Sequence, residues 1–146
     1  MSYTNLLYHI VFGTKRRQPL IHVDVRPRFH RYLGGTVRGL GGIALEVNGI
    51  EDHVHLLVKL KPTICVSDFL RGLKSNSSVW AKDNGMRGFA WQRRYGAFTV
   101  SESQRDIVRR YIQNQEQHHT KFDFETEFEK LLVSNGIPLD EYIWQD

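Results

Sequence analysis

The stretch EDHVHLLVKL, residues 51–60, decides the fold of this chain and points to its chemistry. Its apolar and polar residues alternate as in a β-strand, in which residues two apart point to the same side. His53 and His55 therefore share one face with Leu57 and Lys59. The opposite face is apolar throughout and suits a core; it consists of Val54, Leu56, Val58 and Leu60.

Two imidazoles on one face of a rigid strand form half of a site for a divalent metal ion. A His-x-His pair is also common where no metal binds. The alternative is that His53 and His55 are hydrogen-bonded polar residues on a half-exposed sheet. A second element has to supply the remaining ligands before the pair predicts a metal centre.

The segments around this stretch predict three more strands and two helices. Residues 43–50 and 53–60 form a hairpin with a short turn, and alternation predicts a first strand over 3–13. Residues 95–100 predict the fourth strand. A helix is expected from Asp24, a candidate cap, to about Gly39, and another to about Lys82 with a cap at Thr63 or Ser67. The loop at Asn84-Gly85 ends the second helix.

Two more helices complete the chain. The first is expected over 101–119, with Ser103 and Asp106 as a capping pair, and the second over 123–134. The order strand, helix, strand, strand, helix, strand predicts an α+β, ferredoxin-like split βαβ fold. We expect a four-stranded antiparallel sheet with two helices on one face and the third strand in the centre. Its other face is free to meet nucleic acid or another element.

Length and composition indicate one domain over residues 1–146, with a sheet core over 3–101, a tyrosine-bearing helix over 103–119 and an acidic helix and tail over 123–146. The sequence has no leader typical of a signal peptide and no run of about 18 apolar residues. We therefore expect no membrane partner and a cytoplasmic location. The single cysteine, Cys65, fits a reducing compartment.

Charge is distributed unevenly along the chain, whose formal net charge is +4. Basic residues cluster in the part that carries the histidine pair, which permits a polyanionic partner. Acidic residues gather late, and we interpret them as a solvated, structural end. They are Asp123, Glu125, Glu127, Glu129, Asp140 and Glu141.

The helix over 103–119 offers the second element of a site. Tyr111 and Gln115 are four residues apart and so lie one turn apart on one face. A tyrosine hydroxyl can attack phosphorus, and a glutamine carbonyl oxygen suits Mg²⁺ or Mn²⁺. The alternative is that Tyr111 is a core aromatic packed among Val108, Ile112 and Gln115.

The chain resembles the single-strand DNA transposases of the HUH tyrosine type, the small enzymes of simple bacterial insertion sequences. The resemblance spans nearly the whole chain, through motifs in a fixed order. These are YHIVFGTKRR (8–17), DHVHLL (52–57), LKSNSS (73–78), FAWQ (89–92), YGAFTVS (95–101), YIQNQEQHH (111–119), FETEFEKLL (124–132) and Gly136-Ile137.

The resemblance implies a role for each matching residue. His53 and His55 correspond to the family's paired metal ligands, Gln115 to its third ligand and Tyr111 to its nucleophile. It further implies a catalytic Mg²⁺ or Mn²⁺, a 5′-phosphotyrosine intermediate and a two-fold homodimer, with Tyr111 acting in cis or in trans. No nucleotide cofactor is expected, because no glycine-rich loop has the lysine-serine context of a phosphate site.

The implied substrate is single-stranded DNA folded as hairpins near the ends of the element. Arginine and lysine side chains can meet its phosphates, and unpaired bases can stack on aromatic rings. For each candidate the alternative is an ordinary surface charge. The candidates are Lys15, Arg16, Arg17, Lys74, Arg93, Arg94 and Tyr95.

Three other histidines are assigned lesser roles. His118 and His119 follow Tyr111 and favour capping or surface positions over metal ligation, and His9 is a neighbour of the site on the first strand. Two other functions stay open. One is a domesticated relative, akin to the transposases associated with repetitive palindromic elements, that nicks and rejoins host DNA. The other is a non-catalytic nucleic-acid-binding ferredoxin-like module.

Overall fold

The computed structural model describes residues 2–139. Its sheet has the predicted four antiparallel strands, β1 (Leu6–Gly13), β2 (Gly42–Gly49), β3 (His53–Leu60) and β4 (Gly96–Val100). They lie in the order β2-β3-β1-β4, so β3 is central as expected. The α+β ferredoxin-like prediction is confirmed.

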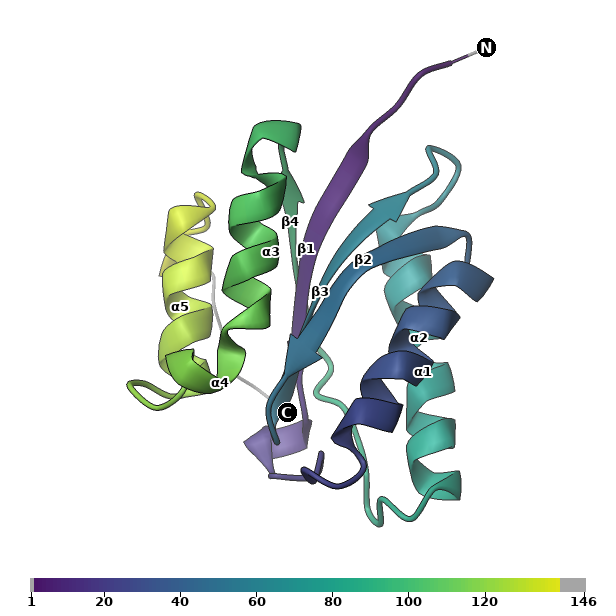
Figure 1. The fold of residues 1–146 in the computed structure, drawn as a ribbon, viewed down its shortest axis with the longest axis vertical. Coiled ribbons are helices and arrows are strands. Elements are labelled where there is room, and N and C mark those ends of the chain that lie inside the picture. Colours follow the sequence, from purple (N-terminus) through teal and green to yellow (C-terminus); the bar gives the residue numbers. More distant parts are fainter. Residues whose placement is uncertain (1, 140–146) are drawn as a thin grey trace.

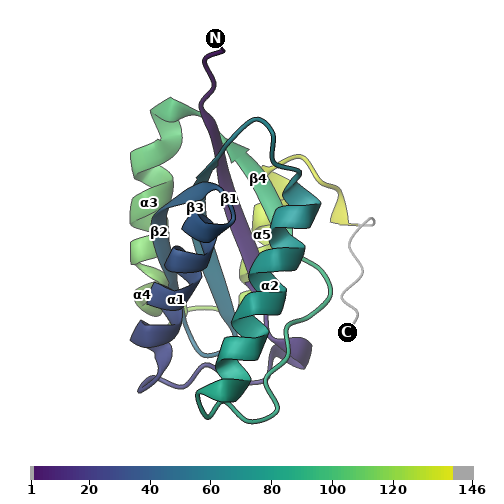
Figure 2. The same ribbon diagram turned by 90° about the vertical axis from the view of Figure 1, so that its right-hand side faces the viewer.

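Helices cover both faces of the sheet (Figures 1 and 2). On one face lie α1 (Arg26–Gly39) and α2 (Val66–Asp83), as predicted. On the other lie α3 (Arg105–Gln113), the single turn α4 (Gln115–His118) and α5 (Phe124–Ser134). The second face is therefore covered by the chain's own helices. Within the described residues no helix has the length and apolar character that a bilayer crossing requires.

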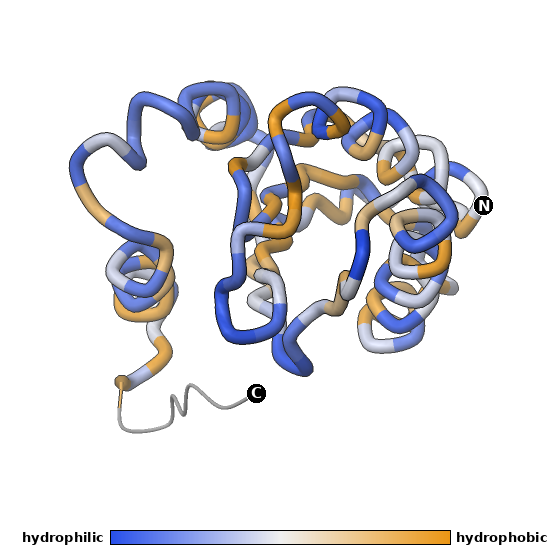
Figure 3. The backbone as a smooth tube through the Cα atoms, turned by 90° about the horizontal axis from the view of Figure 1, so that it is seen from below, coloured by the Kyte–Doolittle hydropathy of each residue, from blue (hydrophilic) through white to orange (hydrophobic). Residues whose placement is uncertain are grey.

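The main core lies between the sheet and α1 and α2. The apolar face of β3, with Val54, Leu56, Val58 and Leu60, is 3% exposed or less, as the alternation predicts. Trp91 packs with Phe12 and Phe29 in this layer. Figure 3 shows hydrophobic segments running through the middle of the molecule. Burial of this apolar surface is the main stabilising contribution to the sheet.

A second, smaller core joins α5 to the opposite face. It consists of Val11, Phe98, Phe124, Phe128 and Leu132. Two glycines make room for its rings. A Cβ at Gly13 would lie 2.7 Å from Phe124, and one at Gly96 would lie 2.9 Å from Phe128. The absence of side chains at these two positions lets α5 approach the sheet closely.

The predicted caps are wrong at three helix starts. The residues preceding α1, α2 and α3 are Val25, Cys65 and Gln104, and none makes a side-chain cap hydrogen bond. Before α3, residues Glu102–Gln104 form a 3₁₀ turn, η2, and the hydroxyls of Ser101 and Ser103 bond each other at 3.0 Å. The Ser103 hydroxyl is thereby engaged outside the helix.

The expected continuous helix over 101–119 is also interrupted. Asn114 has φ −97° and ψ 22°, which ends α3 and begins α4. The Asn48 side chain on β2 donates hydrogen bonds to the carbonyls of Ile112, at 2.9 Å, and Gln113, at 3.2 Å. These long-range bonds satisfy carbonyls that the end of a helix leaves without partners.

Candidate active site

His53 and His55 lie side by side on the face of β3 that α3 and α5 cover. Both side chains are fully buried, and their ring centroids are 5.0 Å apart. Burial without partners would cost several kcal/mol (roughly 2–7) for a polar group in an apolar layer. Their ring nitrogens therefore require polar neighbours, which come from the C-terminal helices.

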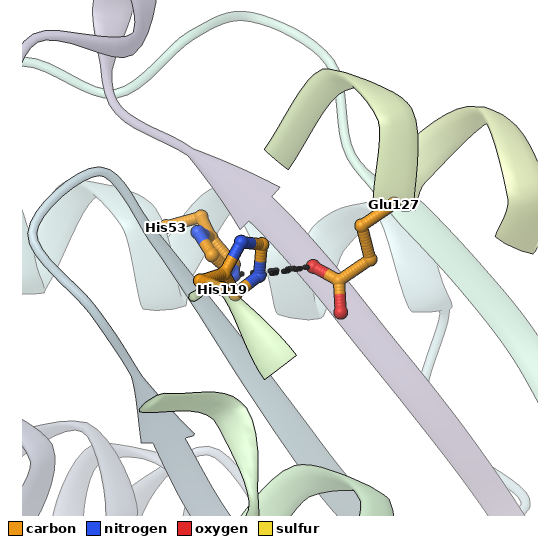
Figure 4. A group of neighbouring side chains, drawn as sticks. All are labelled: His53, His119 and Glu127. Carbon is orange, nitrogen blue, oxygen red and sulfur yellow. Dashed lines mark hydrogen bonds and ion pairs between the residues drawn. The ribbon is translucent and has the colours of Figure 1, made fainter. Parts of the chain in front are cut away.

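Glu127 of α5 provides the centre of the cluster. It is 1% exposed, and its Oε1 lies 3.1 Å from Nε2 of His55 and 3.3 Å from Nε2 of His53. Nε2 of His119 lies 2.9 Å from the same oxygen. Figure 4 shows His53, His119 and Glu127 converging from a strand, a turn and a helix. Three imidazoles thus surround one carboxylate oxygen.

Gln115 joins the cluster from the first turn of α4. Its side chain is fully buried, with Oε1 2.9 Å from Nε2 of His53, and its Nε2 donates to Oε2 of Glu127 at 3.0 Å. Tyr111 lies at the end of α3, and its hydroxyl donates to Oε2 of Glu127 and lies 3.3 Å from Nε2 of His118. The structure therefore brings Tyr111, Gln115, His53 and His55 together within one chain.

The ring of Tyr111 meets imidazoles rather than an aliphatic core. Its edge faces His9, at a centroid distance of 6.0 Å, and His55, at 5.7 Å.

Two hollows meet at the ring of Tyr111. One, of about 590 Å³, is lined by residues of β4, α3 and α5, and the other, of about 550 Å³, by residues of α3 and α4 and the turn after it.

Each imidazole is oriented by a bond on its far nitrogen. Nδ1 of His53 lies 2.8 Å from Asp52 Oδ1, and Nδ1 of His119 lies 2.9 Å from the carbonyl of Phe122. Nδ1 of His55 lies 2.8 Å from Nε2 of His9. Partners of this kind fix the tautomer and direction of metal-binding histidines. His9 therefore does contact the cluster, as predicted from the order of the strands.

The two strand histidines differ in the direction in which the cluster shifts their pKa values. Burial disfavours the charged form of His53, but its bonds to Asp52 and Glu127 outweigh burial and raise its pKa to about 9. For His55 burial dominates and lowers the pKa to about 4, against the opposing effect of Glu127. Burial also disfavours the charged form of Glu127, but three histidine bonds hold its pKa well below the usual range.

The hydroxyl of Tyr111 is not ionised by its surroundings. Burial, and then the negative charge and hydrogen bond of Glu127, raise the pKa of Tyr111 far above its usual value. Burial likewise lowers the pKa of His9 to about 3, with the neighbouring His55 acting in the same direction. His9 is therefore a neutral hydrogen-bonding partner at physiological pH.

Several predicted DNA-binding residues gather at one end of the sheet. The backbone N–H of Lys15 donates to Ala90 at 2.9 Å, so the segment of Lys15–Arg17 lies beside the loop that carries Arg93 and Arg94. Lys15, Arg16, Arg93 and Arg94 are exposed. This is also the end of β1 at which Gly13 pairs with His53.

The other candidates have contacts of their own. Lys74 donates hydrogen bonds to the carbonyls of Gln92, at 2.5 Å, Arg93 and Arg94, and so holds that loop in place. Arg17 pairs with Glu125 at 2.8 Å. Tyr95 is half-buried against the main core. Lys74, Arg17 and Tyr95 are therefore held by neighbouring residues of the protein.

Sequence reasoning missed Glu127 and misplaced His119. The acidic end was expected to be solvated, but Glu127 is buried, and His119, expected at a cap or on the surface, is 5% exposed on its side chain and faces the cluster. A signal was present. Glu127 falls at helical spacing within the apolar stripe of Phe124, Phe128 and Leu131, which a buried helix face requires.

Comparison with known proteins agrees with the sequence motifs. Residues 2–115 match the family described as "Transposase IS200 like". The ISDra2 transposase TnpA of Deinococcus radiodurans is 30% identical over 119 residues, which are 75% of this chain and 84% of that protein. The transposase for insertion sequence element IS200 of Salmonella typhimurium is 34% identical over 79 residues, which are 51% of this chain and 49% of that protein.

Solved structures have the same architecture. A Deinococcus radiodurans protein described as a transposase superposes with a TM-score of 0.65 at 26% identity, covering 78% of this chain and 93% of its own. A tyrosine transposase bound to a REP hairpin superposes with a TM-score of 0.60 at 15% identity, over 82% and 72%, which supports the fold alone. From its motifs, its fold and the match over residues 2–115, this chain belongs to the family of IS200-like transposases.

Proposed function

We propose that this transposase cleaves and rejoins single-stranded DNA at hairpin-bearing element ends, with Tyr111 as the nucleophile. The observation that supports this most directly is the contact between the Tyr111 hydroxyl and the cluster around His53 and His55. A phenol that contacts buried imidazoles and a buried carboxylate is more typical of a reactive side chain than of an aromatic residue packed in a core. The covered sheet face also argues against a module that binds nucleic acid on an exposed sheet.

The donor atoms fit a divalent cation. Nδ1 of His53 faces a carboxylate, which can only accept, so this nitrogen carries the hydrogen. When the His53 ring gives up its second proton, as metal binding requires, Nε2 presents a lone pair to Oε1 of Gln115, which is also an acceptor, at 2.9 Å. A cation between the two atoms would satisfy both. We therefore propose that His53, His55 and Gln115 hold Mg²⁺ or Mn²⁺.

The proposed reaction is an in-line displacement at phosphorus. The Tyr111 oxygen attacks the scissile phosphate, and its proton passes to Nε2 of His118, 3.3 Å from the hydroxyl. The bond to the departing 3′ oxygen breaks and this oxygen takes up the proton, which leaves a 5′-phosphotyrosine and a free 3′ hydroxyl. A divalent cation in the site would supply Lewis acidity at the phosphoryl oxygen. Because the phosphodiester energy is kept in the tyrosine bond, a 3′ hydroxyl can reverse the step.

The Tyr111 hydroxyl bonds Glu127 of its own chain, and the Tyr111 ring contacts His55 of that chain, which supports action in cis. Exposed Lys15, Arg16, Arg93 and Arg94 are proposed to bind the DNA backbone beside the site. The two-fold homodimer implied by the resemblance remains part of this proposal. Two chains would supply one tyrosine for each of two DNA ends.

The test is covalent capture of single strands from the DNA that flanks the gene of this chain. Each strand is labelled at its 3′ or 5′ end and incubated with Mn²⁺. Wild type should shift the 3′-labelled fragment on a denaturing gel and release a shorter 5′-labelled fragment. Tyr111→Phe should abolish both products while DNA affinity stays within about twofold, because only one oxygen is removed.

Tyr32→Phe is the matched control, since it removes a hydroxyl that bonds the carbonyl of Asn76, at 3.4 Å, outside the cluster. It should behave as wild type. His53→Ala and His55→Ala should lose metal-dependent cleavage. A denaturant-resistant adduct in Tyr111→Phe would exclude Tyr111 as the nucleophile, and equal cleavage of duplex DNA would contradict the single-strand preference.

A further inference from the structure

Polar side chains around Glu127 converge on one of its oxygens. The carbonyl of Phe122 can only accept, so Nδ1 of His119 carries the hydrogen at that 2.9 Å contact. Nε2 of His119 is thereby left to face Oε1 of Glu127, also at 2.9 Å. Two such atoms are held together by a positive charge between them, either a proton or a metal ion in its place.

The same arrangement occurs at His53, on the other side of the carboxylate. Its Nε2 faces Oε1 of Gln115 and, at 3.3 Å, Oε1 of Glu127, and neither oxygen carries a hydrogen. Four potential ligand atoms from β3, α4, α5 and the turn after α4 therefore point into one volume. The ligand atoms of His53, His119 and Glu127 all lie within 4.8 Å of one another.

We propose that Glu127 and His119 are ligands of the cation proposed at His53, so that the C-terminal helix completes the metal centre. This inference rests on the proposed function and extends its ligand set by one carboxylate and one imidazole. The resulting set is rich in imidazole, which suits Mn²⁺ and later transition metals better than Mg²⁺. The preferred ion should accordingly be Mn²⁺ rather than Mg²⁺.

The local structure of α5 positions Glu127 for this role. Asp123 caps α5 by accepting a hydrogen bond from the Thr126 N–H at 2.9 Å, and Phe124 stacks on the His53 ring at 4.1 Å with an interplanar angle of 6°. Oε2 of Glu127 is occupied separately by Tyr111 and Gln115. The carboxylate can therefore bind a cation through Oε1 and position the nucleophile through Oε2.

One competing account makes the opposite prediction. If the carboxylate only fills the space of the cation and moves away when the ion enters, its removal should tighten metal binding. If Glu127 is a ligand, its removal should weaken binding. Mn²⁺ titration of the DNA-free protein, followed by the EPR signal of free Mn²⁺, separates the two by the sign of the change.

Glu127→Gln keeps the shape of the side chain and should weaken Mn²⁺ binding by at least about tenfold, since even outer partners of a ligand are worth about 10–100-fold. Glu129→Gln is the matched control, because it removes the same charge two residues further along α5 from a half-buried side chain. It should bind Mn²⁺ as wild type does. Unchanged or tighter binding by Glu127→Gln would overturn the proposal.

A measurement on the wild type guards against a variant that fails to fold. Pulsed EPR of Mn²⁺ bound to the wild type counts coupled imidazoles and should give three, from His53, His55 and His119. A count of two would remove His119 from the ligand set. Failure here is distinguishable from failure of the proposed function, because adduct formation at Tyr111 is scored on a gel and does not depend on which residues bind Mn²⁺.

Discussion

Phe128→Ala should release α5 from the sheet without unfolding the rest of the protein. Phe128 is 2% exposed and belongs to the small core of Val11, Phe98, Phe124 and Leu132. The main core lies on the opposite face of the sheet, so the loss is confined to one layer. We expect the open state of α5 to become populated while the sheet, α1 and α2 keep their stability.

The magnitude follows from the burial of the ring. Removing a fully buried phenylalanine side chain costs about 3–5 kcal/mol, which includes the cavity left behind. If this loss falls on the docking of α5, the opening equilibrium rises between roughly one hundredfold and four thousandfold, since about 1.4 kcal/mol corresponds to a factor of ten. Amide protons of residues 124–134 should exchange faster by that factor.

Hydrogen exchange followed by mass spectrometry is the assay, and Phe29→Ala is the control. Phe29 is also fully buried but belongs to the main core. Its loss should accelerate exchange in all elements together. If Phe128→Ala accelerates exchange equally in α1 and in α5, the two cores unfold as one unit and the reasoning is refuted.

Two further predictions concern single side chains outside the immediate ligand set. Asp52→Asn weakens the partner of His53 Nδ1 and should lower Mn²⁺ affinity by about 10-fold or more, measured by the same titration, and unchanged affinity would contradict an orienting role. Burial, and then the charge of Arg26, lower the pKa of His30 to about 4, so between pH ~6.5 and ~4 the unfolded chain binds a proton that the folded chain does not. The free energy of unfolding should therefore fall by up to about 3 kcal/mol as the pH drops through this window. Denaturant titrations at pH 7 and 4.5 should show a smaller fall for His30→Gln than for the wild type. Identical falls would exclude His30 as the cause.

Local patterns in the sequence predicted the sheet well, because strand alternation directly reports which side chains are buried. The apolar side of β3 goes to the main core, and His53 and His55 lie together on the other side. The spacing of Tyr111 and Gln115 likewise predicted that both lie on one face of a helix, and the resemblance implied that they join the histidines. In each case the decisive spacing lies within a single element.

Two features of the structure depend on long-range contacts, so local sequence patterns could not predict them. The interruption at Asn114 depends on hydrogen bonds from Asn48, which lies 64 residues before Ile112 in the chain. The burial of Glu127 depends on three histidines from other segments, whereas its own neighbours are acidic and typical of a solvated helix. The apolar stripe of α5 predicts which face is buried but not which partner a carboxylate on that face will meet.

The two hollows that meet at Tyr111 bear on what happens after a strand is cut. One is walled by β4 and α5 and the other by α4 and the turn that follows it. In the proposed reaction a cut strand has two different ends, one linked to Tyr111 and one free with its 3′ hydroxyl. Two separate hollows would allow the free 3′ end to leave and another 3′ end to enter while the end linked to Tyr111 stays bound. Exchange of ends, rather than simple resealing, is the outcome that such a layout favours.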